Sequence, residues 1–390
     1  MKLALIGFGQ AGGKVVDAFC AFDETIGGHV VEAAIAVNTA TADLRGLEHV
    51  TPENRVLIGQ SRVKGHGVGA DNELGAEVAA ADVDEIQTAI DRVPVHDLDA
   101  FLIVAGLGGG TGSGGAPVLA THLKRIYNEP VYGLGILPAT DEGGIYTLNA
   151  ARSFRTFTRE VDSLLVFDND AWRQTGESVG SGFERSNREL VERVGRLFAA
   201  GEVSSGDHVA ESVVDASEII NTLETGVATI GYATQSVNSN TSGILERVSG
   251  TSSSTHFGTE HEATNRITSL VRKATLGRLT LPCSVSSADK GLVVAAGPPD
   301  ELSRKGIERG RTWLEEETGS MEIRGGDYPR PGADEVGAIV LLSGVTDVPR
   351  VEQLQSVAVE TKETTSTIRA EQTGGLESLL DTGGELDALF

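Results

Sequence analysis

The chain has 390 residues, which is enough for two domains with substantial cores, and its formal net charge at pH 7 is −24. Such an acidic surface repels nucleic acid and anionic membranes, so the charge excludes both as bulk partners. Few lysines, many carboxylates and an aromatic content of 5% predict a halophilic protein adapted to high salt, although an ordinary acidic cytosolic protein has a similar composition.

Neither the cysteines nor the N-terminal residues indicate an exported protein. Cys20 and Cys283 are too few for a disulfide framework and lack the CxxC spacing of zinc sites. The run MKLALIGFG has one lysine and ends in glycine, unlike a signal peptide or a transmembrane segment. The sequence therefore predicts a cytoplasmic protein without a transmembrane segment or a cluster of metal ligands.

Up to about residue 170, short apolar runs alternate with helical patterns, which predicts an α/β domain with a mostly parallel sheet. The predicted strands are 3–9, 30–38, 55–59, 100–106, 131–137 and 163–170. In such Rossmann-like sheets, ligands bind at the carboxyl ends of the strands. The glycine-rich loops, Asn38 and Asn169 all fall at these ends.

After this domain, the pattern predicts a long amphipathic helix over 183–200 and then a smaller α+β domain. Its predicted helices are 213–224, 266–275 and 300–317, and its predicted strands are 226–237, 291–297, 321–326 and 336–344. We expect a nucleotide-binding domain at 1–182, a central helix at 183–205, a C-terminal domain at 206–345 and a disordered acidic tail at 346–390. The Ser/Thr-rich stretch 237–262 is predicted to be a mobile loop. The tail carries a candidate docking element for an adaptor protein, Leu376, Leu379, Leu380 and Phe390.

The most informative motif is GGGTGSG, Gly108 to Gly114, between the strand at 100–106 and a helix predicted at 117–126. Its glycines remove nearly every Cβ, so backbone N–H groups can converge on an anion in front of the positive end of the helix dipole. The hydroxyls of Thr111 and Ser113 can reach phosphate oxygens or the waters of a bound cation. A plain tight turn needs one or two glycines, so the motif predicts a phosphate site.

A second glycine loop, Gly7 to Gly12, fits G-x-G-x-x-G directly after the first strand, so a NAD(P)-dependent Rossmann enzyme is an alternative. That alternative expects an acidic residue where the second strand ends in Asn38. A P-loop does not fit, because Phe8 and Val15 replace its first glycine and its Ser or Thr. Two glycine loops on adjacent strands predict one polyphosphate held from two sides. A third glycine-rich stretch, 64–73, could close over a terminal phosphate or be a flexible loop.

Further candidates could bind the rest of a nucleotide. Glu142, at a strand end, could bind ribose hydroxyls. Asn169 and Asn187 could bind a base, and Phe183, one turn before Asn187, could stack on it. Taken singly, each of these residues also fits a helix cap or a turn.

These motifs together carry a family resemblance. GGGTGSG is similar to the signature of the tubulin and FtsZ superfamily of polymerising GTPases, and residues 9–14 resemble the first phosphate loop of tubulin. The stretches VKGHGVGAD (63–71) and VDSLLVFDND (161–170) resemble FtsZ. In an acidic chain with few lysines, this mixture resembles the archaeal CetZ branch, from residue 1 to about 345. The resemblance implies a tubulin/FtsZ-like α/β fold with a Rossmann-like GTPase domain, a long central helix and a smaller α+β C-terminal domain.

The resemblance also implies a site for GTP or GDP with Mg²⁺. Asn38 would lie beside the nucleotide, the stretch 64–71 would face the γ-phosphate, and Glu142 would bind ribose. The residues implied to contact guanine are Asn169, Phe183 and Asn187. The residues implied to hold the phosphates are Gly9, Gln10, Ala11, Gly12, Gly13, Lys14, Gly69, Ala70, Gly108, Gly109, Gly110, Thr111, Gly112 and Ser113.

Asp215 and Glu218 match the D-x-x-D/E pattern of the superfamily, whose acids reach the GTP of the next subunit. Spaced three apart at a predicted helix start, they share one face and can orient water together, although helix-capping acids are the alternative. Catalysis between subunits implies a head-to-tail filament that does not close on itself. Tyr146 stands where FtsZ has an arginine, and Val213 replaces the asparagine that opens the catalytic loop, so the hydrolysis rate is left open.

We therefore expect a cytoplasmic, GTP-hydrolysing cytoskeletal protein that polymerises with itself and contributes to the control of cell shape. A nucleotide-dependent structural or adaptor polymer with little GTPase activity is a second hypothesis. The NAD(P)-dependent enzyme is a third, and a comparison of nicotinamide with guanine nucleotide binding separates it from the other two.

Overall fold

The computed structural model describes residues 1–27, 30–173, 179–202, 213–224, 226–237 and 255–360. Residues 238–254 of the expected mobile loop lie outside these ranges, as does the candidate docking element Leu376, Leu379, Leu380 and Phe390. Within the described ranges, no helix is long and apolar enough to span a membrane.

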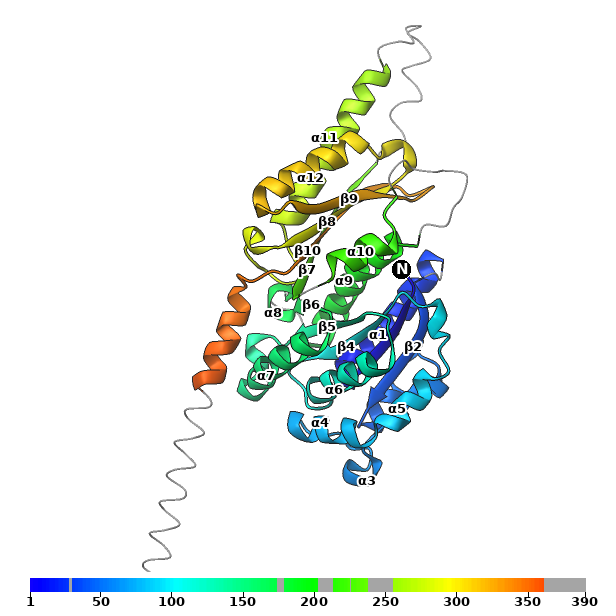
Figure 1. Ribbon diagram of the computed structural model, residues 1–390, viewed down its shortest axis with the longest axis vertical. Helices are drawn as coiled ribbons and strands as arrows, with labels where there is room; N and C mark the ends of the chain where they lie inside the picture. The colour runs from blue at the N-terminus through cyan, green and yellow to red at the C-terminus, as the bar shows by residue number, and fades with distance from the viewer. Residues whose placement is uncertain (28–29, 174–178, 203–212, 225, 238–254, 361–390) are drawn as a thin grey trace, which may run out of the picture.

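The strands of the described chain form one sheet that runs through both halves of the molecule (Figure 1). In order across the sheet, the strands are β3 (Arg55–Leu57), β2 (Val31–Asn38), β1 (Leu3–Phe8), β4 (Ala100–Gly106), β5 (Val131–Leu137), β6 (Ser163–Asp168), β7 (Val227–Ser236), β10 (Glu335–Ser343), β8 (Lys290–Gly297) and β9 (Glu322–Pro329). From β3 to β6 all neighbours are parallel. The halves join where β7 pairs with β6 over Leu164–Val227 and Leu165–Ala228. Beyond that junction β10 is antiparallel to β7 and β8, and β9 is parallel to β8.

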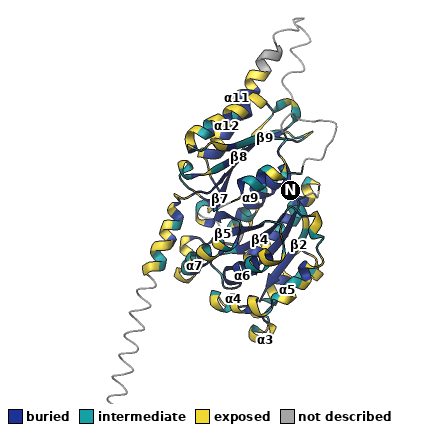
Figure 2. Cartoon of the chain, viewed as in Figure 1, coloured by how far each residue is buried: buried dark blue, intermediate teal, exposed yellow. Residues whose placement is uncertain are grey.

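Helices cover both faces of this sheet, because its strands are apolar on both sides. One face packs against α1 (Gly9–Ile26), α2 (Thr41–Arg45), α9 (Val179–Ala200) and α10 (Ala216–Thr222). The other packs against α4 (Asn72–Ala81), α5 (Val83–Ile90), α6 (Thr111–Ile126), α7 (Gly144–Glu160), α11 (Thr255–Leu276) and α12 (Arg304–Thr318). The short helices α3 (Gln60–Val63) and α8 (Asn169–Trp172) lie in connections. Figure 2 shows the strands buried between these layers and the outer helix surfaces exposed.

The central helix α9 connects the two halves. Its predicted apolar stripe is buried, with Leu190, Val194 and Phe198 at most 1% exposed. The helix packs against α1 in the first half and against β7, β8 and β10 in the second. The helix predicted at 183–200 is therefore confirmed, and it begins earlier, at Val179.

Two stretches of the C-terminal half are more ordered than the sequence predicts. A disordered tail is expected from residue 346, whereas residues 349–360 are helical. Val348 and Leu354 pack into the core at 3% and 1% exposure, which a largely polar segment does not reveal. The mobile loop is expected to extend to residue 262, whereas α11 begins at Thr255.

Candidate functional site

Two glycine segments meet at the carboxyl end of the sheet, where the strand order reverses between β1 and β4. Helix α1 begins at Gly9, and α6 begins at Thr111 rather than at 117. Gly9 has a φ of +74°, and a Cβ there would lie 2.9 Å from the backbone N of Gly112, so the contact between the two segments requires glycine. Two helix N-termini therefore direct their first-turn N–H groups to one place, as a polyphosphate requires.

A cavity of about 840 Å³ opens in front of these two helices. Its volume lies within the range of small-molecule sites. Lys14 is the one lysine or arginine among the described residues that line it, and the helix dipoles add positive potential there. The predicted nucleotide residues that line this cavity are Gly9, Gln10, Ala11, Lys14, Asn38, Gly69, Ala70, Gly108, Gly109, Gly110, Thr111, Gly112, Glu142, Asn169, Phe183 and Asn187.

Three of the predicted phosphate residues do not line the cavity. A Cβ on Gly12 would lie 2.1 Å from the carbonyl oxygen of Val104, so Gly12 allows α1 to pack on β4. Gly13 is buried on the same helix. The Ser113 hydroxyl donates to carbonyl oxygens one turn earlier in the chain, so its hydrogen bond is made inside the protein. These residues support the two helices from behind.

The third glycine-rich stretch closes one side of the cavity. Its residues 66–70 line the cavity, but Lys64 and Asp71 do not. Asp71 instead caps α4, where its carboxylate accepts from the N–H of Leu74 at 3.0 Å. Lys64 and Ala70 have φ values of 51° and 63°, a left-handed conformation that is uncommon for residues other than glycine. Such strained backbone is concentrated at functional sites.

Asn149 on α7 links this stretch to the glycine heptapeptide by hydrogen bonds. Asn149 is not among the residues predicted from the sequence. It is 1% exposed. Its Nδ2 donates to the carbonyl oxygens of Ala70, Gly108 and Gly109 at 2.7, 3.1 and 3.3 Å. An asparagine on the buried face of an amphipathic helix is the signal that could have located it, because a buried amide needs partners.

Asn38 lines the cavity and also builds the turn after β2. Its Oδ1 accepts from the N–H groups of Thr39 and Ala40 at 2.7 and 3.1 Å, and its Nδ2 donates to Asp43 at 3.1 Å. The Thr39 hydroxyl lies 2.7 Å from that of Thr111, which ties β2 to the start of α6. Asp43 also lines the cavity and is a second residue that the sequence analysis misses.

The base and ribose candidates reach the cavity from three elements. Glu142 ends the 3-10 helix η3 (Thr140–Glu142), where its Oε1 accepts from the N–H of Ala139 at 2.7 Å, and burial raises its pKa. Asn169 begins α8 and is 8% exposed. Phe183 and Asn187 lie one turn apart on α9, and the ring of Phe183 is 39% exposed, which leaves a face for stacking.

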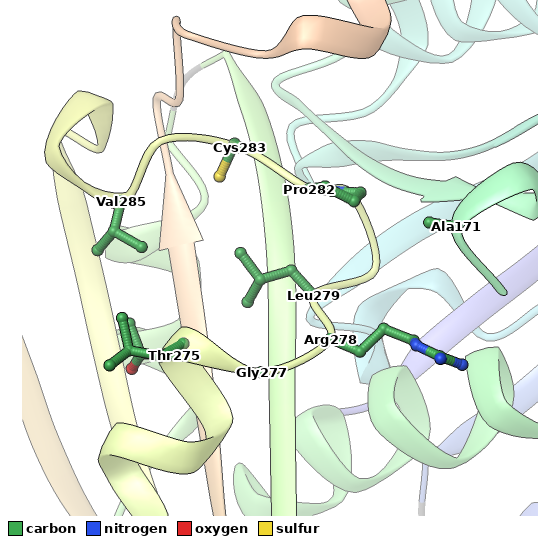
Figure 3. A pocket seen from close by; sticks show the side chains of 9 residues that line it. Ala171, Thr275, Gly277, Arg278, Leu279, Pro282, Cys283 and Val285 are labelled. Carbon is green, nitrogen blue, oxygen red and sulfur yellow. The ribbon is translucent and has the colours of Figure 1, made fainter.

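A second cavity, of about 500 Å³, lies between α8 and the end of α11 (Figure 3). Figure 3 shows the Arg278 side chain extending away from Leu279, Cys283 and Val285. Its guanidinium lies 5.1 Å from the Trp172 ring. Arg278 is the one charged residue among the described residues that line this cavity, and no α-helix begins among them. Of the two cavities, only the larger one has the donors that a polyphosphate needs.

The two acids lie at the opposite end of the first half. Asp215 caps α10, with its Oδ1 accepting from the N–H of Glu218 at 3.0 Å and from the Ser217 hydroxyl at 2.6 Å. Helix α10 packs against β8 and β10. A Cβ added at Gly201 would lie 3.1 Å from both Ile219 of α10 and the Met1 nitrogen, so α10 also lies near the start of β1. Figure 1 shows α10 next to the N-terminus. The structure therefore does not bring these acids to the cavity of the same chain.

Their surroundings shift the pKa values of the two carboxyl groups in opposite directions. The Ser217 hydroxyl is the largest influence that lowers the pKa of Asp215, which is exposed. Partial burial, and then the neighbouring Asp215, raise the pKa of Glu218. Asp215 is thus held in its charged form as a cap, while Glu218 is the stronger base of the pair.

Comparisons with known proteins agree with this geometry. The model of the tubulin/FtsZ family GTPase domain matches residues 2–177, and the model of the C-terminal domain of tubulin-like CetZ matches residues 176–360. Over 374 residues the chain is 66% identical to tubulin-like protein CetZ1 of Haloferax volcanii, covering 95% of this chain and 94% of that protein. The chain belongs to the CetZ family. This membership confirms the resemblance. The residues that fit G-x-G-x-x-G lie within the match to the GTPase domain, so the match does not support the alternative of a NAD(P)-dependent enzyme.

Solved structures of two CetZ proteins from Haloferax volcanii share the fold. A GDP-bound CetZ1 monomer is 63% identical, with a TM-score of 0.82, and the match covers 93% of this chain and all of that one. A GTPγS-bound CetZ2 protofilament is 45% identical, also with a TM-score of 0.82, and the match covers 94% of this chain and all of that one. The predicted tubulin/FtsZ-like α/β fold is therefore confirmed.

Proposed function

We propose that this CetZ protein binds GTP and GDP in the larger cavity, hydrolyses GTP between subunits and forms head-to-tail polymers that contribute to the control of cell shape. One observation carries the proposal: the polyphosphate cradle lies at the carboxyl ends of the strands, and the paired acids lie at the opposite ends. The relative CetZ2, solved as a GTPγS-bound protofilament, supports a polymer that binds guanine nucleotide.

The phosphates would be held by the first turns of α1 and α6. Backbone N–H groups and Lys14 supply positive charge, and Thr111, the first residue of α6, lines the same space. Among the described residues, no three His, Cys, Asp or Glu side chains form a metal site. Mg²⁺ does not need such a cluster, because it keeps several of its waters and binds through substrate phosphates. At this site Mg²⁺ would neutralise phosphate charge.

Glu218 is the residue we assign to the attacking water. Its raised pKa makes it a better proton acceptor, while Asp215 caps α10 and so positions it. The cradle follows the last residue of β1, and α10 lies near its first, so about 20 Å of extended chain separates the two ends. A single chain cannot close that gap, so the acids would act on the nucleotide of the next subunit. Contacts of this heterologous kind build open filaments.

The test is sedimentation with GTP or GDP, with phosphate release measured on the same samples. We expect pelleting that depends on GTP and a specific activity that rises with protein concentration. Glu218→Gln should keep nucleotide binding and lose most hydrolysis. The matched control is Glu224→Gln, an acid that follows α10 and pairs with Lys290 at 2.5 Å. Full activity in Glu218→Gln would contradict the assignment.

The same samples separate the second hypothesis, a structural polymer with little hydrolysis. Tyr146 lines the cavity where FtsZ has an arginine, so a group that would stabilise charge is replaced by a neutral one. GTP-dependent pelleting without phosphate release would favour that hypothesis.

A further inference from the structure

Arg350 connects the C-terminal helical segment 349–360 to the nucleotide cavity. Its side chain is 6% exposed, and its Nη2 donates to the carbonyl oxygen of Pro138 at 2.7 Å. Its Nε lies 3.5 Å from Oδ1 of Asp168, whose side chain is 5% exposed. Nη1 donates to Gln353 at 2.6 Å, within the same segment. One guanidinium therefore contacts two elements more than 180 residues earlier in the chain.

The two contacts lie directly behind the residues that face ribose and base. Pro138 follows β5 and is followed by the turn that ends in Glu142, and Asp168 ends β6 and precedes Asn169. Arg350 does not line the cavity, whereas Pro138, Glu142 and Asn169 do. Arg350 can therefore act on the nucleotide only through these neighbours.

The two loops are also tied to each other in front of Arg350. The backbone N and the hydroxyl of Thr140 both donate to Oδ1 of Asp170, at 3.1 and 2.9 Å. The Ala139 N–H donates to Glu142. The ladder fixes the ends of β5 and β6 themselves, because Leu137 and Asp168 are paired in it. What these bonds and Arg350 add is the placement of the two loops that follow, which carry Glu142 and Asn169.

A buried ion pair is a poor choice for stability alone. Removing two charges from water costs free energy that their attraction often does not return, whereas the geometry that such a pair specifies is a separate reason to retain it. Arginine suits this task because its planar guanidinium fork presents several donors in fixed directions, whereas the ammonium group of lysine is a single point on a flexible chain.

We propose that Arg350 is a positioning residue for base recognition, which holds the loops that follow β5 and β6 in the arrangement that lets Glu142 face the ribose and Asn169 face the guanine. The inference rests on the proposed guanine-nucleotide site. It makes the segment 349–360 a support of that site, although the segment lies far from it in the sequence.

The test measures the affinity of the full-length protein for GDP and IDP by equilibrium competition. IDP lacks the exocyclic amino group of guanine, so the ratio of the two affinities reports base recognition. Arg350→Gln should lower this ratio about tenfold, the effect of about one lost hydrogen bond. Asn169→Ala should remove the same preference. Arg266→Gln, which breaks the pair with Glu301 in the second half, should leave the ratio unchanged.

The outcomes distinguish a failure of the Arg350 inference from a failure of the proposed base site. A ratio that Arg350→Gln leaves unchanged, with a lower melting temperature, assigns Arg350 to stability alone and overturns the inference. A wild-type protein without any preference for GDP over IDP overturns the proposed base site instead. If Arg350→Gln does not fold, Arg350→Lys decides, because it keeps the charge and loses the fork. An unchanged ratio in that variant also overturns the inference.

Discussion

The glycine heptapeptide provides a prediction that separates ligand binding from packing within one motif. A Cβ on Gly109 meets no protein atom within 4 Å, and Gly109 lines the cavity. A Cβ on Gly114 would lie 2.1 Å from the carbonyl oxygen of Asn72 and 2.6 Å from the N of Ala76, both backbone atoms of α4. Gly109→Ala should therefore disturb the ligand, and Gly114→Ala should disturb the fold.

The magnitudes follow from these contacts. Gly109→Ala should change the free energy of unfolding by less than about 0.5 kcal/mol, as for a substitution in open space. It should weaken nucleotide binding about tenfold or more, because the methyl group displaces the phosphate from a charge-assisted hydrogen bond. Gly114→Ala should lower the free energy of unfolding by about 1–3 kcal/mol, because α4 and α6 must separate.

Thermal unfolding without nucleotide and equilibrium binding of GDP measure the two effects separately. Wild-type GDP affinity in Gly109→Ala would refute the assignment of the heptapeptide to the phosphates. An unchanged melting temperature in Gly114→Ala would refute the packing argument.

Two further predictions concern pH and salt. Burial raises the pKa of Asp168 from 3.8 to about 6, so the folded protein holds this proton more tightly, and the stability that it contributes falls as pH rises from about 4 to 6. Urea titrations of Asp168→Asn should show a shallower loss across that range, and parallel curves for variant and wild type would contradict this. The net charge of −24 predicts a lower melting temperature when NaCl falls from 1 M to 0.1 M, because the screening length grows from about 3 Å to about 10 Å. A melting temperature that is unchanged or higher at low salt would contradict the halophilic interpretation.

The sequence predicts the strands well and the helix starts poorly. Continuous apolar runs indicate strands that are buried on both faces, as for β4 and β5. Glycine indicates a turn by propensity, yet Gly112 and Gly114 lie inside α6, where close approach of neighbouring backbone leaves no room for a Cβ. Sequence alone does not separate a glycine required by a ligand from one required by packing. Gly109 is an example of the first case and Gly12 of the second.

The candidate site, too, can be predicted from the sequence only in part. Motif residues at strand ends, such as Asn169, can be located from the sequence because the fold brings those ends together. Asn149 and Arg350 act on the site from an amphipathic helix and from a polar segment near the C-terminus, so their importance depends on tertiary contacts at 79 and 212 residues of separation. The helical pattern can mark Asn149 as a buried amide but does not name its partners, and no local pattern encodes the contacts of Arg350.

The central claim is that GTP lies at a junction completed by the acids of another subunit. Electron cryo-microscopy of polymers assembled with GTPγS tests it most directly. We predict one nucleotide at each longitudinal junction, held by Gly108 to Gly112 of one subunit, with Glu218 of the next subunit facing the γ-phosphate. Polymers in which the nucleotide lies away from the junction, or in which Glu218 faces solvent, would contradict the account.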